Sequence, residues 1–223
     1  MARYSRLEVL SAALEQRVLP IFNTADAATA VDVVDACAAA GARVIEYTNR
    51  GAGAYEVYRA LTAHVAAARP EVMLGAGTIL DAATAALFIA ADADFIVAPT
   101  LSPDVARLCN RRAVPYLPGC FSATEVSDAQ ELGCELIKVF PQAAVDGPAW
   151  LRSVLGPLPW SRLVPTGCPS DADTLRAWFA AGAAGVGVGP DIFTAERLSA
   201  RDTAGMTTAL RAALDVAREA PRR

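Results

Sequence analysis

Short apolar segments alternate with longer amphipathic segments along the whole chain. Each apolar segment has the length of a β-strand, is rich in Val, Ile or Phe, and ends in or next to Gly, Pro, Asn or Thr, which favours a strand over a helix. Eight strands are therefore predicted, at residues 18–22, 43–48, 72–78, 95–99, 114–119, 136–141, 163–167 and 185–189.

The segments between these strands carry apolar residues at helical spacing. In the first of them, residues 27–38, Thr24 is expected to cap the start of a helix and Gly41 to follow its end. Ser122 and Glu125 have the spacing of a capping box, which predicts the start of another helix.

Eight strand–helix units in tandem indicate a parallel sheet. They repeat every ~20–30 residues without a linker, which is typical of a single (β/α)8 TIM barrel, here expected to be one domain spanning residues 1–223. Residues 5–17 are predicted to form an extra N-terminal helix over the barrel bottom, and residues 204–219 the closing helix. A doubly wound open sheet is the alternative, but the first βα turn, residues 23–26, lacks the glycine-rich dinucleotide fingerprint.

Composition narrows the possible functions. The 223 residues are 54% hydrophobic and 20% charged, and the net charge of −4 with scattered basic residues argues against a nucleic-acid partner. No apolar run reaches the ~18 residues of a membrane span, and the N-terminus lacks a signal-peptide pattern. The 5 cysteines have no C-x-x-C spacing, which favours free thiols in a cytoplasmic protein. With 1 histidine, the chain is short of metal ligands, so no metal site is expected. No cofactor is expected either.

One lysine stands out among the cationic residues. Of 20 lysines and arginines, Lys138 is the single lysine, and it lies in the middle of the sixth apolar segment. Strand alternation places it on one face with Leu136 and Phe140. Removal from water lowers the pKa of an amine, and only a neutral amine attacks a carbonyl, whereas arginine stays charged. The alternative is a lysine that reaches solvent or pairs with a core carboxylate.

The second strand places Glu46, Thr48 and Arg50 on one face. A buried Glu46 near an amine can move protons, and Arg50 can bind a carboxylate through two hydrogen bonds. An internal ion pair of Glu46 with Arg50 or Lys138 is an equally good interpretation.

Glycine-containing turns follow three other strands. Gly75-Ala-Gly-Thr78 ends the third strand, and its Thr78 hydroxyl can donate to a carboxylate. Thr166, Gly167 and Gly189 end the last two strands, where barrels commonly bind phosphate on backbone N–H groups. Tight packing explains these glycines as well as an anion site does.

Taken together, these residues resemble the 2-keto-3-deoxy-6-phosphogluconate (KDPG) / 4-hydroxy-2-oxoglutarate aldolase family of class I, Schiff-base aldolases. The resemblance runs from about Val18 to Phe193, and its most specific part combines the lysine strand with the Glu-x-Thr-x-Arg strand. The matching segments are Glu46-x-Thr48-x-Arg50, Gly75-Ala-Gly-Thr78, Pro118-Gly119, Lys138-Val-Phe-Pro141 and Pro165-Thr-Gly167.

The resemblance implies a homotrimeric, metal-free barrel that cleaves a 4-hydroxy-2-keto acid into pyruvate and an aldehyde. Lys138 would be the Schiff-base nucleophile and Glu46 the general acid and base. The substrate-binding residues it implies are Arg50 and Thr78 for the pyruvate carboxylate, Phe140 beside the imine, Gly167 and Gly189 for a phosphate, and Thr48, Pro99 and Thr166 as further contacts.

Two positions depart from the family pattern. Cys168 replaces a glycine and Pro190 replaces a serine of the phosphate corner. Proline has neither an N–H nor a hydroxyl, so at least one donor to a phosphate is lost. A phosphate-binding barrel isomerase or synthase, and a non-catalytic barrel that binds a sugar acid, are the alternative functions. Cys168 and His64 are both expected to be structural.

Overall fold

The computed structural model describes residues 2–142 and 147–221. Helices and strands alternate along these residues, as predicted. The strands are β1 (Val18–Phe22), β2 (Val44–Thr48), β3 (Met73–Gly77), β4 (Phe95–Val97), β5 (Tyr116–Leu117), β6 (Gly119–Cys120), β7 (Ile137–Val139), β8 (Leu163–Cys168) and β9 (Val186–Val188). The helices are α1 (Arg6–Gln16), α2 (Ala27–Ala40), α3 (Ala54–Ala68), α4 (Ala82–Ala90), α5 (Pro103–Arg112), α6 (Ala123–Glu131), α7 (Gly147–Leu155), α8 (Ala172–Ala180), α9 (Ala195–Ala200) and α10 (Thr203–Glu219).

All the strand pairs are parallel, in the order β5-β4-β3-β2-β1-β9-β8-β7-β6. β5 and β6 are two halves of the predicted fifth strand and are joined through Pro118. β5 pairs with β4 and β6 pairs with β7, so this one segment closes the barrel. The (β/α)8 barrel is therefore confirmed, and the open doubly wound sheet is excluded.

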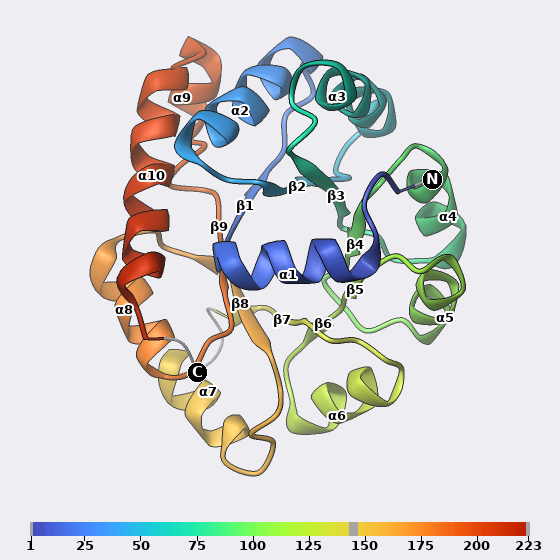
Figure 1. Cartoon of the computed structure of the whole chain (residues 1–223), viewed down its shortest axis with the longest axis vertical. Helices are drawn as coiled ribbons and strands as arrows, with labels where there is room; N and C mark the ends of the chain where they lie inside the picture. Colours follow the sequence, from blue (N-terminus) through green and yellow to red (C-terminus); the bar gives the residue numbers. More distant parts are fainter. Residues whose placement is uncertain (1, 143–146, 222–223) are drawn as a thin grey trace.

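The helices form a ring around the strands, and α1 lies across its middle (Figure 1). A capping box of Ser5 and Glu8 starts α1, and Arg17 ends it in the left-handed conformation. Val9 and Leu10 pack on residues of the barrel interior that include Val44 and Phe95. The predicted helix over the barrel bottom is thus confirmed.

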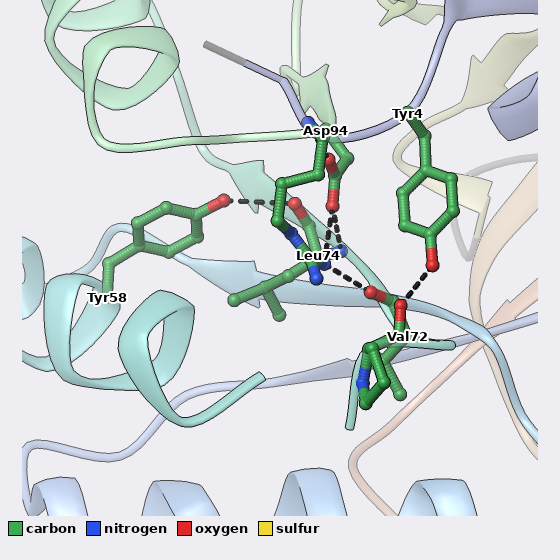
Figure 2. A network of polar contacts seen from close by, with 7 residues as sticks. Tyr4, Tyr58, Val72, Leu74 and Asp94 are labelled. Carbon is green, nitrogen blue, oxygen red and sulfur yellow. Dashed lines mark hydrogen bonds and ion pairs between the residues drawn. The ribbon is translucent and has the colours of Figure 1, made fainter. Parts of the chain in front are cut away.

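The segment before α1 is fastened to the barrel by polar contacts, which Figure 2 shows. The carboxylate of Asp94 accepts hydrogen bonds from the backbone N–H groups of Arg3 and Leu74, both at 2.9 Å. Tyr58 donates to the Leu74 carbonyl at 3.0 Å, and Tyr4 donates to the carbonyl of Pro70. The contacts of Asp94 and Tyr58 with Leu74 satisfy buried polar groups at the end of the barrel opposite to the predicted site.

Two helix starts test the predicted capping residues. Ser122 caps α6 and forms a complete capping box with Glu125, as predicted. Gly41 ends α2 in the left-handed conformation, also as predicted, but the N-cap of α2 is Asp26 and not Thr24. Asp26 accepts from the N–H of Thr29 at 2.7 Å, so the helix begins two residues later than expected.

Candidate active site

Lys138 lies in β7 with its side chain on the inner face of the barrel. Its neighbours Ile137 and Val139 face outward into the core beneath the helices, whereas Leu136 packs in the barrel interior. The Lys138 side chain is buried, with 7% of the residue exposed, and its Nζ lies 5.1 Å from the centre of the Phe140 ring. Its backbone N–H donates to the Pro118 carbonyl at 2.9 Å. The amine is therefore held on a rigid strand and largely shielded from water.

Glu46 lies on the inner face of β2 and is completely buried. Neither of its carboxylate oxygens has a hydrogen-bonding partner among the residues that the structure describes. Burial raises the pKa of the Glu46 carboxyl above its ordinary value, while the positive charges of Lys138 and Arg50 oppose that rise. The internal ion pair considered for Glu46 is therefore not formed. Its carboxyl instead holds a proton more strongly than an exposed glutamate does.

Gly77 provides the space that the Glu46 carboxyl occupies. A Cβ atom on residue 77 would lie 1.9 Å from Glu46 Oε1, far inside van der Waals contact. The sequence suggested the glycines of β3 as places where a substrate meets the backbone. In the structure Gly77 instead accommodates a neighbouring acid, a role that becomes visible only once β2 and β3 are paired with Thr48 opposite Gly77.

Arg50 and Thr78 come together just beyond the ends of β2 and β3. Arg50 Nε points to the Thr78 hydroxyl at 3.4 Å, and Thr78 has a φ of 61°. The side-chain amide of Asn23, which the sequence did not single out, donates to the Thr48 carbonyl at 2.7 Å and fastens the end of β2. The exposed guanidinium and the hydroxyl thus lie side by side, an arrangement that suits a carboxylate.

A cavity of about 190 Å³ opens at the carboxyl ends of the strands and brings most of the predicted residues together. Its lining combines two cations, hydroxyl groups, backbone of the last two strand ends, and apolar side chains. The lining residues are Ile21, Phe22, Asn23, Thr48, Arg50, Lys138, Phe140, Thr166, Gly167, Val188, Gly189, Pro190 and Phe193. We call it the Lys138 cavity.

Three predicted residues do not line this cavity. Glu46 lies wholly beneath the surface, and Thr78 contacts Arg50 from outside the lining. Pro99 lies in the wall of a neighbouring cavity of about 830 Å³, which shares Phe140 with the Lys138 cavity. Pro99 therefore lines a different cavity from Lys138, although it lies against Gly119, the residue that pairs with Lys138.

Cys168 and His64 were both expected to be structural, and neither lines the Lys138 cavity. Cys168 is buried at the end of β8, and burial together with the charge of Asp191 raises the pKa of its thiol to about 12. It is therefore a neutral thiol and not a nucleophile. His64 lies on α3, where its Nε2 contacts Asp35 Oδ1 at 2.9 Å, outside the lining of the Lys138 cavity.

Fold and cavity together define the class of protein, a (β/α)8-barrel enzyme with an amine and a buried carboxyl at the end of the barrel where such enzymes act. Comparison with known proteins gives the family. The model of the KDPG and KHG aldolases matches residues 9–209. The chain belongs to the KDPG and KHG aldolase family, and it is thus an aldolase, an enzyme of the lyase class.

Individual relatives agree with this assignment. The chain is 37% identical to a 2-dehydro-3-deoxy-phosphogluconate aldolase of Pseudomonas aeruginosa over 153 residues, which cover 69% of this chain and 68% of that one. It is 30% identical to the enzyme of the same name from Haemophilus influenzae, over 74% of this chain and 76% of that one. The solved structure of a 2-keto-3-deoxy-6-phospho-gluconate aldolase from Zymomonas mobilis superposes with a TM-score of 0.82 at 25% identity, over 96% of this chain and 98% of that one.

No helix within the described residues is both long enough and apolar enough to span a membrane.

Proposed function

We propose that this enzyme cleaves a 4-hydroxy-2-keto acid, of the KDPG or 4-hydroxy-2-oxoglutarate type, into pyruvate and an aldehyde through a Schiff base on Lys138. The observation that carries the proposal is the position of Lys138. Its side chain is nearly buried and lines the cavity at the barrel mouth. Its charge acts on Glu46, an acid without a hydrogen-bonding partner among the described residues.

The chemistry follows from the two side chains. The neutral amine of Lys138 attacks the C2 ketone of the substrate, and the carbinolamine loses water to give a protonated imine. Removal of the C4 hydroxyl proton breaks the C3–C4 bond, the aldehyde departs, and the electron pair moves to the imine as an enamine. Protonation of the enamine at C3 and hydrolysis of the imine then release pyruvate and restore the amine.

Glu46 is proposed to carry the protons in these steps. A carboxyl whose pKa is raised by burial is protonated over more of the neutral range than an ordinary glutamate, so it can donate to the departing hydroxyl and take the proton back. The absence of a competing hydrogen bond on either oxygen within the described residues leaves it available for this transfer.

The remaining predicted residues are proposed to position the substrate. Arg50 and Thr78 would hold the C1 carboxylate, and Phe140 would pack beside the imine. Thr48, Thr166, Gly167 and Gly189 would shape the cavity around the rest of the molecule. Pro99 lines the neighbouring cavity and would contact the substrate only if the substrate reaches that cavity.

Trapping with borohydride tests the covalent step. Pyruvate and sodium borohydride together should inactivate the enzyme irreversibly and add one reduced pyruvyl group to Lys138, whereas either reagent alone should not. The chain has a single lysine, so the label is easy to locate by peptide mass spectrometry. A barrel isomerase that uses Lys138 only as a charge would keep its activity and stay unlabelled. A non-catalytic sugar-acid binder would stay unlabelled and release no pyruvate from any 4-hydroxy-2-keto acid.

The resemblance also supports a proposal about assembly and location. We expect a homotrimer in the cytoplasm that needs no metal ion or cofactor. Light scattering should then give three times the chain mass of 23.2 kDa, and activity should survive treatment with EDTA.

A further inference from the structure

Arg50 lies on a turn that side chains do not pack against from outside. It follows β2, and the turn continues through Gly51 and Gly53, which have φ values of 86° and 80°. A Cβ atom on either glycine would meet no atom within 4 Å beyond its chain neighbours. Among the described residues, the Arg50 guanidinium has one hydrogen-bonding partner, the Thr78 hydroxyl at 3.4 Å. The position of Arg50 therefore depends on what holds its backbone.

The side chain of Asn23 holds that backbone from the adjacent strand. Asn23 directly follows β1, which pairs with β2. Its amide Nδ2 donates to the Thr48 carbonyl at 2.7 Å and to the Arg50 carbonyl at 3.4 Å. The N–H of Arg50 donates to the same Thr48 carbonyl at 2.9 Å. One amide group thus joins the end of β2 to the start of the turn, and we call these two bonds of Asn23 the Asn23 bridge.

Asn23 is itself fixed on both sides along the chain. The Thr48 hydroxyl donates to the carbonyl of Phe22 at 3.4 Å, and the Tyr47 hydroxyl donates to the carbonyl of Thr24 at 3.0 Å. Tyr47 is completely buried, so the second of these contacts comes from the core. The bridge therefore starts from a firmly held residue and can impose a position on the turn.

The Asn23 bridge lies at the proposed site and not behind it. Asn23 lines the Lys138 cavity together with Thr48 and Arg50. A side-chain amide has two N–H donors, and both acceptors of Asn23 Nδ2 are carbonyls of its own chain. The donors of Asn23 are thus used within the protein, so its effect on a bound molecule is exerted through Arg50.

We propose that Asn23 is a positioning residue, whose bridge orients the Arg50 guanidinium toward the carboxylate of the 2-keto acid in the Lys138 cavity. The inference rests on the proposed function, in which Arg50 binds that carboxylate. Two parallel hydrogen bonds to a carboxylate need an aligned guanidinium, so a small shift of the Arg50 backbone weakens them. The ketone and Lys138 are not touched by that shift.

Imine trapping with two ketones tests the inference. Pyruvamide has the ketone of pyruvate but an uncharged amide in place of the carboxylate, and sodium cyanoborohydride reduces the imine that either forms with Lys138. The measured quantity is the ketone concentration that gives half of the maximal trapping rate. In Asn23→Ala this concentration should rise about three- to tenfold for pyruvate, as expected for one neutral hydrogen bond, and stay unchanged for pyruvamide.

The two ketones separate positioning from a structural role. A loosened barrel would weaken the trapping of pyruvate and of pyruvamide to the same extent, and that result would overturn the inference. An unchanged pyruvate concentration in Asn23→Ala would overturn it as well.

A double variant shows whether Asn23 acts through Arg50. Arg50→Ala alone should weaken pyruvate trapping, because the carboxylate loses its cationic partner. Adding Asn23→Ala to Arg50→Ala should cause no further loss, since there is no guanidinium left to orient. Losses that multiply in the double variant would mean that Asn23 meets the substrate directly, and the positioning role would be wrong.

Asn110→Ala is the matched control. Asn110 is exposed on α5 and its Nδ2 donates to the Leu132 carbonyl at 2.8 Å, but it does not line the Lys138 cavity. Its removal deletes the same kind of bond and should leave both half-saturating concentrations unchanged. A selective loss of pyruvate trapping in Asn110→Ala would contradict the role of Asn23.

Asn23→Leu covers the case in which Asn23→Ala does not fold. Leucine keeps the branching of asparagine without its polar atoms, so this variant should show the same selective loss for pyruvate, with circular dichroism as the check of the fold. Failure of both variants to fold would make Asn23 a structural residue and would overturn the inference.

The unaltered enzyme keeps the two proposals apart. If pyruvate labels its Lys138 but Asn23→Ala behaves like the unaltered enzyme, the positioning role is wrong and the covalent step stands. If pyruvate does not label Lys138 in the unaltered enzyme, the proposed function fails first, and the inference fails with it.

Discussion

Lysine and arginine carry the same charge, but only lysine can lose it at physiological pH. The chain uses arginine at 19 of its 20 basic positions and lysine at one. That position is an inward-facing residue of β7, where water is largely excluded. A purely electrostatic role would be met by either residue, so the choice of lysine supports the proposed Schiff base, which an arginine cannot form.

Lys138→Arg should therefore abolish catalysis. The variant keeps the positive charge, but its guanidinium cannot form the imine, and we expect kcat to fall by on the order of 10³-fold or more. Pyruvate release from a 4-hydroxy-2-keto acid measures the loss, and circular dichroism checks the fold. Residual activity within tenfold of the unaltered enzyme would rule out the Schiff base.

Glu46→Gln should slow the reaction while the barrel stays intact. The amide has the shape of the protonated acid but cannot exchange its proton with the substrate, so kcat should fall roughly 10²- to 10⁴-fold. Borohydride trapping of pyruvate on Lys138 measures whether the imine can still form. A variant with full activity would remove Glu46 from the mechanism.

The same variant should change how stability depends on pH. Burial raises the pKa of the Glu46 carboxyl, so the folded protein keeps this proton to a higher pH than the unfolded chain does. The contribution of this proton to the free energy of unfolding is fully present below the ordinary pKa of 4.5. It is lost as the pH rises through the raised pKa of the folded protein. The melting temperature of Glu46→Gln should therefore increase relative to that of the unaltered protein as the pH rises. A constant difference between pH 4 and pH 8 would contradict the raised pKa.

At the scale of elements, the sequence predicted the strands well and their ends less well. The pattern predicted β1 with the bounds that the structure has, because buried parallel strands are continuous apolar runs between turn residues. It could not show that the fifth strand is divided at Pro118 into β5 and β6. That division depends on which partner each half meets across the closed barrel.

The sequence also predicted the helices better than the residues at which they begin. Thr24 and Asp26 are both good capping residues, and the sequence pattern alone does not choose between them. In the structure Asp26 takes the position because its carboxylate reaches both the N–H and the hydroxyl of Thr29, each at 2.7 Å. The second hydrogen bond, from the Thr29 hydroxyl, favours Asp26 over Thr24 as the N-cap of α2.

Gly77→Ala tests how β3 supports the site. The added methyl group would displace the Glu46 carboxyl, and we expect a loss of about 1–3 kcal/mol in stability together with a lower kcat. Thermal melting and steady-state rates measure both effects. Gly156→Ala is the control, because its Cβ would lie 3.6 Å from the nearest atom, at an ordinary contact distance. Normal activity in Gly77→Ala would mean that the position of Glu46 is not critical.

For the molecule as a whole, strand alternation was enough to bring Lys138, Thr48, Arg50, Phe140 and Thr166 to one cavity. Contacts between loops could not be predicted in this way. Asp191 and Ser170 lie in loops, where no periodicity relates one residue to another, so their pairing follows only from the closed barrel. The strand pattern likewise did not predict that Pro99 lines a separate cavity.

The cysteines provide a prediction for the whole fold. All five are free and buried, and burial raises the pKa of every one of these thiols. The folded protein should therefore react slowly with a thiol reagent such as DTNB, and all five groups should react at once in guanidinium chloride. Rapid reaction of any thiol in the native protein would show that the barrel opens locally around it.

The contact between Gly77 and Glu46 bears on attempts to move this chemistry into another barrel. Transferring an acid and an amine on two strands is not sufficient. The acid also needs space on the neighbouring strand, and a glycine there provides that space because it has no side chain. Three positions on three strands would have to be transferred together: Lys138, Glu46 and a glycine equivalent to Gly77. In a recipient barrel with alanine or a larger residue at the third position, the side chain would collide with the glutamate carboxyl.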